Sequence, residues 1–163
     1  MTRTLAKKTI LMSGGSRGIG LTIALRAARD GANIALLAKT AEPHATLEGT
    51  VYTAARDVEA AGGQALPLVG DVRSDEDVMS AASKAAEQFG GIDVVLNNAS
   101  AIDLSTTEQL EMKRYDLMQD INTRGTVLLS KAALPYLRQA ANPHVLTLSP
   151  PLNLSPAWVG AHL

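Results

Sequence analysis

The sequence predicts an α/β fold in three layers, with helices on both faces of a parallel sheet of about five strands. Two observations support this prediction. Short apolar runs that are typical of strands alternate along the chain with longer runs of helical periodicity. The strand-like runs are continuously apolar, which is expected when helices cover both faces of a sheet. Right-handed crossovers between neighbouring strands then favour the strand order 3-2-1-4-5.

The first half of the chain holds three predicted strands and two predicted helices. They are a strand at residues 9–12, a helix at 18–29, a strand at 33–38, a helix at 50–61 and a strand at 65–69. Glycine follows each helix, at Gly31 and Gly62, and readily adopts the left-handed conformation that ends helices. The polar stretch at 39–49 is predicted to be a loop.

The second half continues the alternation. Its predicted elements are a helix at 74–89, a strand at 92–96, a long helix at about 107–137, a strand at 144–148 and a loop at 149–163. Ser74 is the expected N-cap of its helix, because three acidic residues follow it and favour the positive end of the helix dipole.

Composition limits the possible functions. The chain has 163 residues, of which 46% are hydrophobic, so one folded domain with one core is expected. A net charge of −1 provides no basic field for nucleic acid or an anionic membrane. Without cysteine, and with scattered histidines, the sequence predicts no metal site. No signal peptide or apolar run of roughly 18 residues is present, so a cytoplasmic protein is expected.

The run SGGSRGIG at residues 13–20 joins the first predicted strand to the first predicted helix. Unpaired N–H groups and the dipole at a helix start favour an anion, and glycines let a pyrophosphate approach the backbone. This layout is typical of a Rossmann-type dinucleotide-binding domain. The predicted cofactor-binding residues in it are Gly14, Ser16, Arg17, Gly18, Ile19 and Gly20. The alternative is a glycine-rich turn that binds no ligand.

Further motifs occur in order along the chain. They are DV at 71–72, NNAS at 97–100, NTRG at 122–125, TLSPPLNL at 147–154 and AKTAEPH at 38–44. Together with the glycine run, they make the sequence resemble the short-chain dehydrogenase/reductase family, and within it the hydroxysteroid dehydrogenase-like group. The resemblance implies an oxidoreductase that interconverts a small-molecule alcohol and a carbonyl by hydride transfer to or from a nicotinamide cofactor.

Two cations bear on the choice of cofactor. A carboxylate at the end of the second strand would bind a ribose 2′-hydroxyl and select NAD. The chain has Lys39 there instead, and Arg17 lies in the glycine run. Both could pair with a 2′-phosphate, so NADP is favoured over NAD. The alternative is that Lys39 is a solvated loop residue.

The family resemblance assigns further residues to the cofactor. It implies that Asp71 accepts a hydrogen bond from the adenine amino group and that Val72 supplies a backbone contact. Asp71 could instead be an ordinary aspartate in the loop before a helix. Asn98 and Ala99 would lie beside the cofactor ribose, where the family more often has glycine than Ala99. Asn97 is expected to be structural.

Two residues are candidates for the chemistry. Asn122 interrupts a predicted helix, and asparagine is a weak helix former. The resemblance implies that it perturbs the helix and positions a water in a proton relay; alternatively, it caps a break between two helices. Ser149 lies near the family's catalytic serine, but Pro150 occupies the usual place. Ser149, Asn153 or Ser155 could substitute, or Ser149 could be a turn residue.

The family's Tyr-x-x-x-Lys pair is absent from this sequence. The residues four positions after Tyr52, Tyr115 and Tyr136 are arginine, glutamine and alanine. We therefore expect residues 1–163 to be a dinucleotide-binding domain that stops before the helix carrying this pair, with a fold incomplete on its C-terminal side. Such a fold would expose apolar sheet surface, so homo-oligomers are expected. The alternative functions are a catalytically silent dinucleotide-binding module and a dimerising interaction protein.

Overall fold

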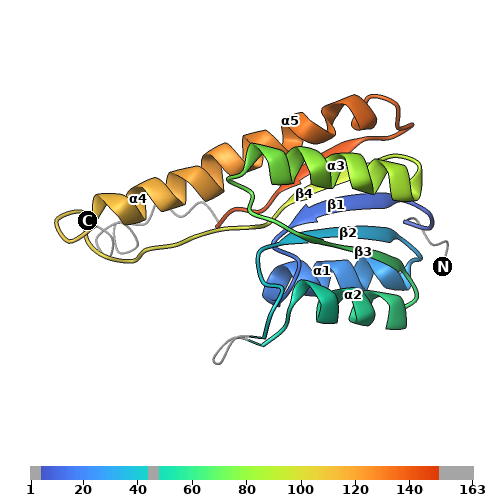
Figure 1. The fold of residues 1–163 in the computed structure, drawn as a ribbon, viewed down its shortest axis with the longest axis horizontal. Coiled ribbons are helices and arrows are strands. Elements are labelled where there is room, and N and C mark those ends of the chain that lie inside the picture. Colours follow the sequence, from blue (N-terminus) through green and yellow to red (C-terminus); the bar gives the residue numbers. More distant parts are fainter. Residues whose placement is uncertain (1–4, 44–47, 151–163) are drawn as a thin grey trace.

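The computed structural model describes residues 5–43 and 48–150. Its strands are β1 (Thr9–Ser13), β2 (Asn33–Ala38), β3 (Gln64–Val69), β4 (Val94–Asn97) and β5 (His144–Thr147). They form one sheet in the order β3-β2-β1-β4-β5, and all neighbouring strands are parallel (Figure 1). The predicted fold class and strand order are confirmed.

Helices cover both faces of this sheet. They are α1 (Gly18–Arg29), α2 (Val51–Ala60), α3 (Asp75–Phe89), α4 (Met112–Met118), the π-helix η1 (Gln119–Gly125) and α5 (Thr126–Leu137). Leu11 of β1 joins the core beneath α3 and α5, whereas its neighbours Ile10 and Met12 join the core beneath α1 and α2. Successive strand residues are therefore buried on opposite faces along β1 and β2, whereas all four residues of the edge strand β5 are exposed.

Two helices begin at capping residues. The Thr50 hydroxyl accepts the N–H of Thr53, and the Thr53 hydroxyl accepts the N–H of Thr50, which forms a capping box at α2. The Ser74 hydroxyl accepts the N–H of Asp77 at 3.2 Å, so the predicted cap of α3 is confirmed. Gly90 ends α3 in the left-handed conformation, with φ +81°.

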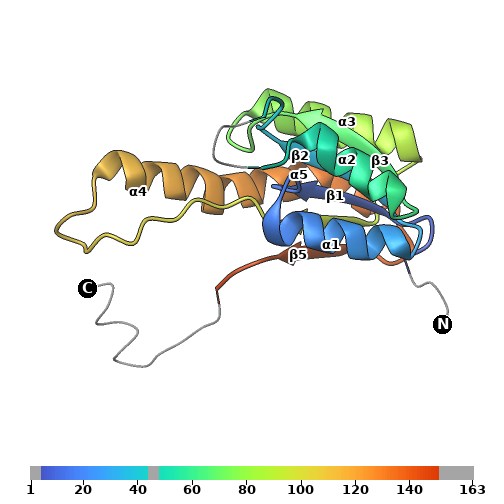
Figure 2. The same ribbon diagram turned by 90° about the horizontal axis from the view of Figure 1, so that it is seen from below.

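The long helix predicted at 107–137 is wrong in two respects. Helix begins only at Met112, because the backbone at Glu111 is extended. Before it, the Thr106 carbonyl accepts the N–H groups of Gln109 and Leu110 in a single turn. The remaining helix is then interrupted by η1, which separates α4 from α5. Figures 1 and 2 show α4 extending well beyond the end of the sheet.

The order of the strands determines where a ligand site can form. From β1 the chain moves to β2 and β3 on one side, and later to β4 and β5 on the other. The loops after β1 and β4 therefore leave the sheet in opposite directions. In an open parallel sheet, such a reversal creates a crevice at the carboxyl ends of the strands.

The packing of α5 provides a test of the fold. Leu129 on α5 is fully buried, whereas Leu134 on the same helix is 40% exposed. We expect Leu129→Ala to lower the free energy of unfolding by about 3 kcal/mol, because it leaves a cavity between α5 and the sheet. Leu134→Ala is the control, with an expected loss below about 1 kcal/mol. Urea denaturation measures both, and equal losses would contradict this packing.

Candidate functional site

An open cleft of about 420 Å³ lies at the carboxyl ends of the strands, next to the loops after β1, β2, β3 and β4. The predicted cofactor residues that line it are Gly14, Ser16, Arg17, Ile19, Gly20, Lys39, Asp71, Val72, Asn98 and Ala99. Gly18 belongs to the same loop but does not line the cleft. Sequence reasoning missed the lining residues Leu37, Ala38, Thr40, Gly70, Ser100 and Ile121. The structure thus gathers residues far apart in sequence into one site.

The glycines of the first loop serve two purposes. A Cβ on Gly20 would lie 2.5 Å from the Gly14 carbonyl oxygen, and one on Gly14 would lie 2.9 Å from the Cα of Ala99. These two glycines allow the loop to pack closely on the protein itself, and both also line the cleft. At Gly18, with φ +56°, a Cβ would meet nothing within 4 Å. Only here does glycine combine a left-handed backbone with open space in this loop.

The start of α1 has no side-chain cap. Arg17 occupies the N-cap position with an extended backbone, and no side chain accepts a hydrogen bond from the first turn. The starts of α2 and α3, in contrast, are capped by Thr50 and Ser74. The first N–H groups of α1 therefore keep their donor capacity, next to the open side of Gly18. This arrangement suits an anion such as a phosphate.

Ser13 and Asn98 brace the loops after β1 and β4 against each other. The buried Ser13 hydroxyl accepts the N–H groups of Asn98 and Ala99, both at 3.1 Å. The Asn98 side-chain amide donates to the carbonyl oxygens of Ser13 at 3.2 Å and Gly14 at 2.8 Å. The predicted cofactor residue Asn98 thus also shapes the phosphate loop. The sequence analysis did not predict this role for Ser13. The available signal was a small hydroxyl residue at the end of a buried strand.

Asp71 is the centre of a charged cluster. The Arg73 side chain donates to both of its carboxylate oxygens, with Nη2 at 2.6 Å from Oδ2. The Lys39 Nζ lies 3.2 Å from the same Oδ2. The hydrogen bonds from the Arg73 side chain hold the pKa of the Asp71 carboxyl well below its usual range, and Lys39 contributes further. Sequence reasoning missed Arg73.

The two predicted cofactor cations are partly engaged with the protein. Lys39 pairs with Asp71, so it is not simply a solvated loop lysine, yet 60% of its side chain remains exposed. The Arg17 guanidinium donates to the Gly49 carbonyl at 2.9 Å, which ties the phosphate loop to the segment before α2. Both residues line the cleft. They bring positive charge to the side of the cleft where β2 ends.

Asn122 lies within η1. Its amide donates to the Ala101 carbonyl, and its carbonyl accepts the Ala101 N–H, both at 2.9 Å. Asn122 is therefore not a helix cap; the helix widens into a π-helix around it, as the predicted perturbation requires. Its neighbour Ile121 lines the cleft, whereas Asn122 holds the segment that follows β4.

Ser149 lies just beyond β5. Its exposed hydroxyl donates to the Pro150 carbonyl at 2.8 Å, and Ser149 does not line the cleft. The alternatives Asn153 and Ser155, with most of the predicted loop at 149–163, lie outside the described residues.

Asn97 is structural as predicted, because its amide donates to the hydroxyls of Ser130 and Thr147.

The described part of the chain offers no candidate for a metal site or a membrane-spanning helix. Within residues 5–43 and 48–150, no three histidine, aspartate or glutamate side chains come together in a way that could hold a metal ion. Over the same residues, no helix combines the length and apolar character that a membrane crossing needs.

A parallel sheet with this order and a glycine loop before an uncapped helix defines the class of Rossmann-type dinucleotide-binding domains. The family profile described as short chain dehydrogenase matches residues 8–156. The chain therefore belongs to the short-chain dehydrogenase family. Oxidoreductases of this family use nicotinamide dinucleotides as cofactors, in agreement with the resemblance seen in the motifs.

Individual relatives agree with this assignment. The chain is 55% identical to hydroxysteroid dehydrogenase-like protein 2 of Bos taurus, and the match covers 99% of this chain and 38% of that protein. The crystal structure of a short chain dehydrogenase from Mycobacterium thermoresistibile has a TM-score of 0.91 at 56% identity, covering 96% of this chain and 56% of that one. The NADH-dependent reductase A1-R′ complexed with NAD has a TM-score of 0.77 at 29% identity, covering 90% and 61%. The chain thus spans about two fifths of the length of its curated relative.

The brace between the two loops can be tested by removing one hydroxyl. Ser13→Ala leaves the N–H groups of Asn98 and Ala99 without their acceptor, and we expect it to lower the free energy of unfolding by about 1–3 kcal/mol. Ser83→Ala, an identical change at an exposed position on α3, should alter it by less than about 0.5 kcal/mol. Urea denaturation compares the two variants. Indistinguishable unfolding curves would show that the brace contributes nothing.

Proposed function

We propose that this protein is an NADP-dependent oxidoreductase that interconverts an alcohol and a carbonyl on a small molecule, with its cofactor in the cleft between the ends of β1 and β4. One observation carries the proposal: the start of α1 has no side-chain cap, and Ser16, Arg17, Ile19 and Gly20 around it line the cleft. That arrangement fits a pyrophosphate. Because the chain matches only part of its curated relative, the activity is proposed for the whole protein.

The residues of the cleft fit a dinucleotide along its whole length. The first N–H groups of α1, from Gly18 to Gly20, would bind the pyrophosphate. Asp71 and Val72 would border the adenine, with Asn98 and Ala99 beside the ribose. The bound cofactor would supply the capacity to give or accept a hydride.

The charge distribution favours NADP. Near the end of β2, the Lys39 ammonium and the guanidinium of Arg73, from the loop after β3, both pair with the Asp71 carboxylate, and 60% of the Lys39 side chain remains exposed. Arg17 lines the same cleft and adds another cation. A 2′-phosphate would be stabilised by the Lys39 and Arg17 cations that line the cleft, whereas the Asp71 carboxylate is already bound to two cations and is less available to the ribose hydroxyls of NAD. The NAD complex of the reductase A1-R′ does not decide the preference of this chain, because only 29% of the residues are identical.

The chain's own residues would also orient the reacting groups. Asn122 holds the Ala101 backbone at the end of the cleft and supports a proton relay through its position in η1. Ser149 remains the candidate for a hydroxyl near the substrate, although its place beyond β5 lies outside the cleft lining. Both roles are part of the proposal.

A second candidate function is a dinucleotide-binding module that does not turn over substrate. The observation in its favour is that the hydroxyl of Ser149, the candidate for the chemistry, donates to the Pro150 carbonyl and does not line the cleft. A proton donor or acceptor is needed for hydride exchange between an alcohol and a carbonyl. Cofactor binding without turnover of any carbonyl substrate by the whole protein would favour this module.

Self-association is also part of the proposal. Members of this family typically form oligomers, and we propose homo-oligomers for the whole protein.

The phosphate site can be tested at Gly18. Gly18→Asp adds a carboxylate next to the uncapped start of α1, where the pyrophosphate is proposed to bind, and we expect the dissociation constant of NADP to rise about 100-fold or more. Gly90→Asp is a matched control, because Gly90 also has a left-handed backbone and a Cβ there would meet nothing within 4 Å. Isothermal titration calorimetry measures both constants. Binding unaffected by Gly18→Asp would reject the assigned site.

The cofactor preference can be tested at Lys39. Lys39→Asp should shift the ratio of the NADP and NAD dissociation constants toward NAD by about tenfold or more, because it replaces a cation by a carboxylate. Lys39→Met removes the cation without adding a charge beside Asp71, and should shift the ratio less. Lys131→Asp, on the exposed surface of α5, controls for net charge. If the ratio is the same in all variants, Lys39 does not select the cofactor.

A further inference from the structure

The π-helix η1 is held from both sides by side chains that it contributes. On one side, Asn122 pairs with the backbone of Ala101, which follows β4. On the other side, the Arg124 guanidinium donates to the Arg73 carbonyl at 2.7 Å and to the Asp75 carboxylate at 2.8 and 3.0 Å. These contacts reach the loop after β3. One short segment therefore binds to the two loops that form opposite sides of the cleft.

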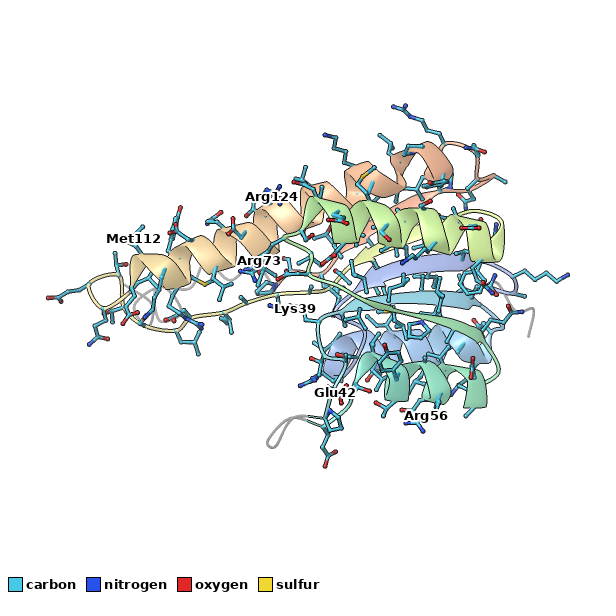
Figure 3. The ribbon with its side chains drawn as sticks, viewed as in Figure 1. Lys39, Glu42, Arg56, Arg73, Met112 and Arg124 are labelled. Carbon is cyan, nitrogen blue, oxygen red and sulfur yellow. The ribbon has the colours of Figure 1, made fainter. Side chains whose placement is uncertain are left out.

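Arg73 connects Arg124 to the adenine side of the cleft. Its side chain is bound to Asp71, and its carbonyl oxygen accepts from Arg124. Figure 3 shows Arg73 between Arg124 and Lys39, at the end of the sheet where the long helical segment passes. The charged cluster at Asp71 and the π-helix are thus joined through a single residue.

Close packing strengthens this junction. A Cβ on Gly125 would lie 3.1 Å from the Cγ2 of Val72, so η1 and the loop after β3 are in tight contact at this point. Val72 and Ile121 both line the cleft. A shift of η1 away from this loop would therefore move two of the cleft's lining residues apart.

We propose that Arg124 is a positioning residue: by holding η1 against the loop after β3, it sets the spacing of the cleft and keeps Asn122 in place at Ala101. The proposal rests on the proposed cofactor function of the cleft. No contact between Arg124 and the cofactor is required.

The ion pair between Arg124 and Asp75 is exposed to solvent, and this determines which measurement can reveal a positioning role. The side chains of Arg124 and Asp75 are 47% and 68% exposed. Exposed ion pairs contribute little to global stability, because water and salt screen them. The loss of Arg124 should therefore change the cleft more than it changes unfolding. Ligand affinity and local protection are the readouts that distinguish positioning from general structural support.

The experiment measures NADP binding by calorimetry in the whole protein. Arg124→Ala should raise the dissociation constant of NADP about 5- to 10-fold, while the midpoint of thermal unfolding stays within about 2 °C of wild type. Arg124→Lys retains the charge but cannot form the fork of hydrogen bonds, so it should restore only part of the affinity. Arg138→Ala, at the exposed end of α5, should bind NADP like wild type.

A second measurement tests the spacing without any ligand. Amide hydrogen exchange at Ala101 should accelerate in Arg124→Ala, because this N–H is held by Asn122 on the opposite side of η1. Combining Asp75→Ala with Arg124→Ala should weaken NADP binding less than the two single effects together, since the residues act through one contact.

The possible failures are distinguishable. If wild-type protein binds neither NADP nor NAD, the proposed function of the cleft is rejected. If wild-type protein binds NADP but Arg124→Ala matches Arg138→Ala in affinity and in exchange at Ala101, the positioning role is rejected and the cofactor function stands. A large loss of thermal stability in Arg124→Ala would also reject the positioning role, since Arg124 would then support the fold as a whole.

Discussion

The site depends on one set of hydrogen bonds between the ends of β1 and β4. β1 and β4 pair in the sheet up to Met12 and Leu96, but the chain leaves the two strands in opposite directions, so further contacts are needed to hold their loops together. Ser13 and Asn98 supply that connection, each binding the other's loop. The same contacts press Ala99 against Gly14 and set the position of the glycine loop. The open face at Gly18 and the free donors of α1 follow from this arrangement.

The sequence was sufficient for the fold and for most of the cleft, but not for the contacts that organise it. Alternating apolar runs predicted the strands, and parallel pairing then placed Gly14, Lys39, Asp71 and Asn98 at one edge of the sheet. These predictions needed only local patterns and a rule of topology. The pairing of Ser13 with Asn98 joins residues 85 positions apart, and Arg124 meets Asp75 across 49 positions. No local pattern specifies such partners. The π-helix was missed for the same reason, because the partner of Asn122 is the distant backbone of Ala101.

The charged side chains at the cleft form one cluster around Asp71. Asp71 was predicted as an adenine contact and Lys39 as a phosphate contact, yet the structure joins them through one carboxylate that Arg73 also binds. With the pKa of Asp71 held well below its usual range, that carboxylate stays ionised across the neutral range. The ion pair with this carboxylate orients Lys39 before any anion arrives. Such preorganisation reduces the entropy lost on binding.

The pairing of Asn122 with Ala101 also separates the segment between these two residues from the rest of the site. It closes a loop that contains α4 and the irregular segment before it, both of which extend beyond the sheet (Figure 2). Since the ends of this loop are fixed to each other, a change of length or sequence within it need not be transmitted to the glycine loop or to the strands. The sequence of this loop can thus change to accommodate different substrates while the residues proposed to bind the nucleotide stay the same.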